Sequence, residues 1–213
     1  MNTKNTNVII LALIVVAFVV GFIFYPQLPE KVASHWNSAG EPNGFMNRFW
    51  GTFLMPIVMV GLFLLYFIIP KIDPLKSNIE SFRKYYNVLW IFMFAFFLYV
   101  FAITIVWNLG FEFNFLFAMV PAIAVLWFFL GVFLKKIKRN WFMGIRTPWT
   151  MSNDIVWDKT HKLGGTLFEI SALISLSALF LKSEMVIFAV IVPAILVAII
   201  TVVYSYFEYK KLK

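Results

Sequence analysis

The chain has two polar stretches that combine titratable side chains with tryptophan, and each holds one of its two histidines. The first covers residues 25–50 and reads YPQLPEKVASHWNSAGEPNGFMNRFW, with His35 and Trp36 between Glu30 and Glu41. A histidine beside carboxylates is suited to binding a ligand or exchanging a proton near neutral pH, and a histidine that only packs the turn is the structural alternative. Glu30, His35, Trp36 and Glu41 are therefore our candidate ligand contacts in this stretch.

The second stretch covers residues 135–169 and reads KKIKRNWFMGIRTPWTMSNDIVWDKTHKLGGTLFE. It holds seven of the 18 Lys and Arg residues and three of the eight Trp. The TPW segment at 147–149 predicts a change of chain direction, and Ser152 is expected to cap a helix over residues 152–181. At helical spacing, one face of that helix carries a polar stripe, formed by Asp154, Asp158, His161, Gly165 and Glu169.

Glu169 is the carboxylate placed deepest in an apolar run. It lies about one to two turns inside that run, where an unpaired carboxylate is costly. It needs a proton or a partner, and we expect Arg146 or His161, since Arg binds a carboxylate through two parallel hydrogen bonds. Two interpretations are open: Glu169 is a ligand or proton site, or it pins the loop to the helices.

Residue types argue against enzyme and metal chemistry. The chain has no Cys, and it lacks the H-E-x-x-H, G-x-S-x-G and P-loop patterns. His35 and His161 are predicted on opposite faces of the membrane, so they cannot share a metal ion. An intramembrane hydrolase needs paired catalytic groups inside the apolar runs, and Glu169 alone is found there. We predict no catalytic residue, no metal site and no cofactor.

The elements that carry these stretches are predicted to be membrane helices. With 62% apolar and 13% charged residues, the chain is far more apolar than a soluble domain. At roughly 20 residues per crossing, there are six apolar runs without an internal Lys or Arg, at residues 8–24, 49–69, 88–107, 113–134, 165–181 and 185–207. The predicted fold is one domain over residues 1–213, an all-α polytopic membrane helix bundle with six transmembrane helices.

Basic residues set the expected orientation through the positive-inside rule. Fifteen of the 18 Lys and Arg residues fall on the side that carries both ends of the chain, and Lys31, Arg48 and Lys182 fall on the other. We expect both termini and the 135–164 loop in the cytoplasm, the 25–48 loop outside the cell, and a multi-pass protein of the plasma membrane. The basic charge then reflects topology and contact with an anionic lipid membrane, and binding to nucleic acid is not needed to explain it.

Both loops have an expected local structure. In the outer loop, residues 29–36 are expected to form a short helix along the membrane surface, and residues 40–44 a turn. In the inner loop, tryptophans interleaved with basic residues are typical of a segment that lies in the headgroup plane. Such a segment offers a platform that a cytosolic partner can contact.

Both stretches resemble motifs of one family. LPEKVASHWNSAGEPNGF is similar to the motif of a small membrane domain of unknown function found in the N-terminal part of the SdpI family. NWFMGIRTPWTMSNDIVWDKTHKLGG resembles the cytoplasmic signature of that family. With six predicted spans, the resemblance covers essentially the whole chain. The residues that carry the cytoplasmic motif are Asn140, Gly144, Arg146, Thr147, Pro148, Trp149, Trp157, Thr160, His161 and Gly164.

The resemblance implies a function by binding. SdpI-type proteins protect the producing cell from a secreted peptide toxin and can act as receptors that hold a cognate transcriptional repressor at the membrane. The implied partners are a peptide toxin at the outer loop and a cytosolic repressor protein at the inner loop. The alternative is a small proton-coupled transporter that uses Glu169, and six helices of this size would then need a homodimer.

Overall fold

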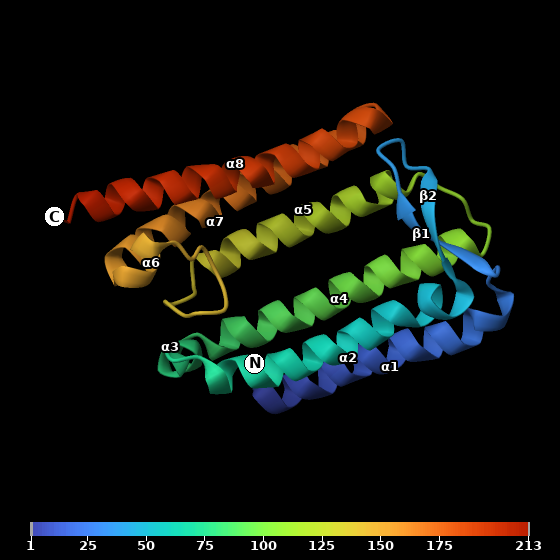
Figure 1. Cartoon of the computed structure of the whole chain (residues 1–213), viewed down its shortest axis with the longest axis horizontal. Coiled ribbons are helices and arrows are strands. Elements are labelled where there is room, and N and C mark those ends of the chain that lie inside the picture. Colours follow the sequence, from blue (N-terminus) through green and yellow to red (C-terminus); the bar gives the residue numbers. More distant parts are fainter. Residues whose placement is uncertain (1, 213) are drawn as a thin grey trace.

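The computed structural model describes residues 2–212 as helices with one β-hairpin (Figure 1). Two short 3-10 turns, Tyr25–Gln27 and Ala178–Phe180, extend the first and seventh helices. The hairpin strands are β1 (Lys31–Trp36) and β2 (Pro42–Asn47). The helices are α1 (Thr3–Phe24), α2 (Arg48–Ile72), α3 (Lys76–Ser81), α4 (Arg83–Asn108), α5 (Phe115–Leu134), α6 (Pro148–Ser152), α7 (Asp154–Ser177) and α8 (Ser183–Lys210).

Six of these helices are long and apolar enough to cross a membrane within the described residues, which confirms the predicted six-helix membrane bundle. Helices α1, α2 and α4 pack together, helices α5, α7 and α8 pack together, and α4 contacts α5 between the two groups (Figure 1). The short helices α3 and α6 and both chain ends lie at one end of the bundle, which we call the termini end, and the hairpin lies at the other, the hairpin end.

Asparagine side chains start four of the long helices by accepting hydrogen bonds from the free N–H groups of the first turn, at Asn2, Asn47, Asn114 and Asn153. The prediction that Ser152 caps the seventh helix was wrong. Asn153 accepts from the N–H groups of Ile155 and Val156, at 2.8 and 3.2 Å, and Ser152 is the last residue of α6. The amide oxygen of Asn153 reaches two N–H groups because its backbone is extended, with ψ 130°.

Helices α5 and α7 make the most extensive helix contact of the described chain. A Cβ atom added at Gly131 would lie 2.5 Å from the carbonyl oxygen of Gly165, and one added at Gly165 would lie 2.5 Å from that of Gly131. Only glycine allows two backbones to approach this closely, as small residues do in many membrane helix pairs. The contact of Gly131 with Gly165 therefore holds the start of α7, which belongs to the inner loop, close to the end of α5.

The predicted short helix over residues 29–36 was wrong, because residues 31–36 form strand β1. It pairs antiparallel with β2 in a register that joins Lys31 to Asn47 and Trp36 to Pro42. The turn between them contains Gly40 with a φ of 83°, a conformation that favours glycine. Val32 is fully buried and packs against Gly51 of α2. Pairing with residues 42–47 in a hairpin therefore outweighs the helical preference expected for residues 29–36.

At the termini end, two hydrogen bonds join the region between α2 and α4 to the segment that follows α5. The buried carboxylate of Asp73, after α2, accepts from the backbone N–H of Trp141 at 2.9 Å. The side chain of Asn78 in α3 donates to the carbonyl of Arg139 at 2.8 Å. Our reasoning from sequence missed both residues, since neither belongs to a recognisable motif. They hold the 135–146 segment against α3 and the end of α2.

Candidate functional site

The hairpin is fixed to α4 and α5. The side chain of Asn108 accepts from the N–H of Ala33 at 2.7 Å and donates to its carbonyl at 3.0 Å, as a neighbouring strand would. Trp36 stacks on Phe115 at the start of α5, with ring centroids 3.7 Å apart. Asn114 donates to the carbonyl of Ala39 in the turn at 3.2 Å. The hairpin is thus a rigid cover over the ends of the helices.

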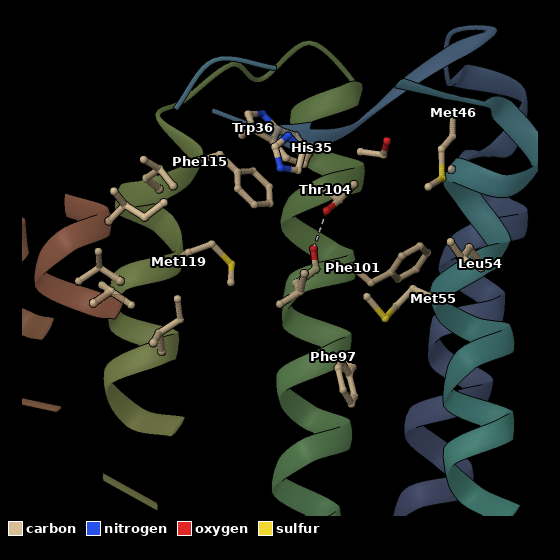
Figure 2. A pocket seen from close by; sticks show the side chains of 18 of the residues that line it. His35, Trp36, Met46, Leu54, Met55, Phe97, Phe101, Thr104, Phe115 and Met119 are labelled. Atoms are coloured by element: carbon tan, nitrogen blue, oxygen red, sulfur yellow. Dashed lines mark hydrogen bonds between the residues drawn. The ribbon is translucent and has the colours of Figure 1, made fainter. Parts of the chain in front are cut away.

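An apolar cavity of about 550 Å³ lies beneath this cover, between α2, α4, α5 and α8 (Figure 2). Phe97, Phe101 and Met119 line it in the helices, and His35 and Trp36 line it from the hairpin. Its few polar groups, those of Ser34, His35 and Thr104 among them, gather at the hairpin end. Sequence reasoning missed this cavity, because its walls come from segments far apart in the chain. An apolar ligand with one polar end fits this lining.

The candidate contacts of the outer loop divide into two groups. His35 and Trp36 line the cavity, and the Nδ1 atom of His35 lies 2.5 Å from the side-chain oxygen of Asn43. Glu30 and Glu41 are exposed and do not line it. Glu41 accepts a hydrogen bond from Asn37 at 3.3 Å, which fixes it at the turn. The described residues contain no group of three or more His, Asp or Glu side chains that could hold a metal ion.

The predicted cytoplasmic motif folds into one cluster at the termini end. Asn140 is fully buried, and its side-chain oxygen accepts from the N–H groups of Phe142 and Met143 at 3.0 and 2.7 Å. Arg146 donates to the carbonyl of Trp141. Thr147 and Thr150 form a reciprocal capping box at the start of α6, with Pro148 in its first turn. These residues shape the loop by binding its backbone.

His161 lies at the centre of this cluster. Its ring stacks on fully buried Trp157 with centroids 3.9 Å apart. Nε2 accepts from the N–H of Ile145 at 2.9 Å, so Nδ1 carries the proton and donates to the carbonyl of Trp157 at 2.8 Å. Gly144 has a φ of 101°, and a Cβ there would collide with Nε2 of His161. The histidine is therefore neutral and structural in this arrangement.

The rest of the motif joins the cluster to α8 and to the end of α5. The hydroxyl of Thr147 lies 3.0 Å from that of Ser205, and Trp149 packs edge-on against Tyr206, with centroids 5.1 Å apart. The indole N–H of Trp157 donates to the carbonyl of Ile137 at 3.2 Å. Thr160 is fully buried, and a Cβ at Gly164 would collide with Ile145. A side chain at this position would therefore displace the end of the Ile145 side chain.

The predicted partners of Glu169 were wrong. Its carboxylate binds the ammonium of Lys135, at the end of α5, with 2.7 Å between the charged atoms. Arg146 and His161 are occupied by the backbone groups described above. The contact of Gly131 with Gly165 brings α5 so close to α7 that Lys135 reaches Glu169. Residue spacing within α7 alone cannot predict Lys135 as the partner, because Lys135 belongs to another element.

The acids of the predicted polar stripe all meet the segment that follows α5. Asp154 binds Arg139 at 2.9 Å, Asp158 binds Lys138 at 3.5 Å, and Glu169 binds Lys135. Asp154 and Asp158 are exposed, so each of their pairs contributes at most about 1 kcal/mol. The acids of the stripe therefore form ion pairs that join α7 to the segment after α5.

A further ion pair lies at the end of α8. There, a hydrogen bond to the Glu208 carboxylate raises the pKa of Lys211.

The substitution His161→Phe is expected to lower the free energy of unfolding by about 2 kcal/mol. The phenyl ring keeps the stack on Trp157 but leaves the N–H of Ile145 without its partner, at about 1–3 kcal/mol for an unpaired buried group, whereas the carbonyl of Trp157 keeps its helical hydrogen bond. Thermal unfolding in detergent micelles measures the loss. His35→Phe is the matched control, because His35 is exposed and should change stability little. Equal losses in both variants would contradict the structural role of His161.

Comparisons with known proteins agree with both motifs. The model of a domain of unknown function, DUF1648, matches residues 12–60, which include the hairpin. The model of the SdpI/YfhL protein family matches residues 136–205, which include the motif cluster, α7 and most of α8. No solved structure matches the chain.

Two relatives come from Bacillus subtilis (strain 168). The chain is similar to the immunity protein SdpI, with 25% identity over 207 residues that cover 97% of both chains. It is also similar to the uncharacterized membrane protein YbgB, with 34% identity over 47 residues that cover 22% of this chain and 52% of the relative. Matches at both motifs and a relative similar over its full length confirm the resemblance of this chain to the SdpI/YfhL protein family.

Proposed function

We propose that this protein protects its cell against a secreted peptide toxin by binding it at the hairpin end. The observation that carries the proposal is the similarity to the immunity protein SdpI over 97% of the chain. The apolar cavity beneath the hairpin supports it, because apolar and aromatic walls with few polar groups suit an apolar segment of a peptide. His35 and Trp36 contact that segment at the cavity, and exposed Glu30 and Glu41 meet basic or polar groups outside it.

The proposal includes an orientation with both termini in the cytoplasm and the hairpin outside. The termini end carries the inner loop and nearly all the basic residues, which supports this orientation through the positive-inside rule. A cytosolic repressor is the proposed partner at that end. The exposed side chains of Trp141 and Phe142 support a contact there, since they project from a loop that is otherwise well packed.

Thiol labelling tests the orientation in this cysteine-free chain. Ser38 in the hairpin turn and Ser152 at the end of α6 are both exposed, so burial does not bias the result. In intact cells, an impermeant maleimide should label Ser38→Cys and leave Ser152→Cys unlabelled, and permeabilised cells should label both. Labelling of Ser152→Cys in intact cells would reverse the proposed topology.

Survival of a toxin-sensitive bacterium tests the function. Cells that express the chain are challenged with toxins of the type neutralised by SdpI proteins and with any small secreted peptide encoded beside it. We expect survival at toxin concentrations that kill cells with an empty vector. Killing of both strains by every peptide would overturn the immunity proposal. No observation favours the transporter alternative, since Glu169 is bound in an ion pair with Lys135.

A further inference from the structure

A second cavity lies at the termini end, directly after the last turn of α5. Its volume is about 550 Å³. It has an apolar floor and a basic wall, and its lining is Leu134, Lys135, Lys136, Ile137, Lys138, Asp158, His161 and Lys162. Leu134 and Ile137 are buried, whereas the four lysines lie on the surface of the protein. The cavity thus combines an apolar base with a concentration of ammonium groups.

The charges of this cavity do not cancel. Glu169 binds Lys135, and Asp158 binds Lys138 at 3.5 Å. Lys136 and Lys162 have no carboxylate within 4.0 Å in the part of the chain that the structure describes. His161 adds no charge, because its Nε2 atom accepts a hydrogen bond. Two ammonium groups are therefore free to bind an anion.

The cavity lies at the depth where lipid phosphates are found. Helix α5 carries no charged residue from Phe115 to Leu134, and the run of lysines begins at the next residue. The uncharged helix marks the hydrocarbon layer, so Lys135 and Lys136 are at its edge. A lipid whose phosphate occupies the cavity keeps its acyl chains beside α5 without leaving the bilayer.

We propose that this cavity binds the phosphate of an anionic phospholipid headgroup, with Lys136 and Lys162 as its contacts. Ammonium groups bind phosphate oxygens through charge-assisted hydrogen bonds, and two of them lining one cavity hold one phosphate more selectively than a diffuse basic surface does. The site is independent of the proposed toxin contact, which lies at the other end of the bundle.

Lipid binding to the purified full-length chain in detergent tests the proposal. Native mass spectrometry or a titration is carried out with phosphatidylglycerol, with phosphatidylcholine and with inorganic phosphate alone. The double variant Lys136→Gln/Lys162→Gln should bind phosphatidylglycerol on the order of 30-fold more weakly than the parent chain, the loss expected for two juxtamembrane lysines. Its melting temperature without lipid should be unchanged, because neither ammonium group forms an ion pair with any of the described residues.

The matched control is Lys76→Gln/Lys84→Gln, which removes the same charge from exposed positions at the same end, outside the cavity. It should retain the affinity of the parent chain within about threefold, since distant surface charges are screened. Equal weakening in both double variants would overturn the proposal in favour of diffuse attraction. Equal binding of the two lipids would overturn selectivity for an anionic headgroup. Inorganic phosphate that binds as tightly as phosphatidylglycerol would overturn the lipid assignment.

Discussion

Replacing Gly131 by valine is expected to lower strongly the yield of folded protein in the membrane. A Cβ at this position would lie 2.5 Å from the carbonyl oxygen of Gly165 and 2.8 and 3.1 Å from Cγ and N of Glu169. Two of these atoms belong to the backbone of α7, so a side-chain rotation cannot relieve the collision. Separation of α5 and α7 also breaks the ion pair between Lys135 and Glu169.

The expected cost of Gly131→Val is about 3 kcal/mol or more, at the upper end of overpacking effects, against a total stability of about 5–15 kcal/mol for a typical domain. Size-exclusion chromatography of a fluorescent fusion measures the folded fraction. Gly61→Val is the matched control, because it adds the same side chain inside α2 with no atom within 4 Å of the new Cβ. Similar folded yields for the two variants would contradict the close contact of α5 and α7.

The six helices were predictable from sequence because their signals are local. Long apolar runs and the placement of basic residues need no knowledge of neighbours. Strand β1 could not be found in this way, since residues 31–36 become a strand only by pairing with β2. Burial of Val32 against Gly51 of α2 adds a second contact across the chain. A purely local reading of that segment misses both contacts.

The candidate sites follow the same distinction. Helical periodicity correctly placed Asp154, Asp158 and Glu169 on one face of α7, and all three bind residues 135–139. It could not identify Lys135 as the partner of Glu169, because that depends on the glycine contact between two helices. The apolar cavity was missed for a similar reason. Its lining is ordinary apolar membrane sequence, and the space appears when four helices and the hairpin are assembled.

Filling this apolar cavity is expected to abolish toxin protection without unfolding the protein. Val100 of α4 lines the cavity and is partly exposed in it. In Val100→Trp, the indole occupies space that the apolar toxin segment needs under the proposed function. Cells with this variant should survive toxin no better than cells with an empty vector. Because the cavity is already open, the larger side chain should cost less than the roughly 1–3 kcal/mol of insertion into a packed core.

Val125→Trp separates loss of the site from a general effect of a new indole in a membrane helix. Val125 lies on α5, is 54% exposed and does not line the cavity, so this variant should retain full protection. Membrane abundance and melting temperature are measured for both variants, because a fall in either would explain lost protection without the cavity. If Val100→Trp is folded, abundant and fully protective, the cavity is not the toxin site. The contact must then involve the exposed hairpin alone, where His35→Ala becomes the decisive variant, because His35 lies on the hairpin at the edge of the cavity.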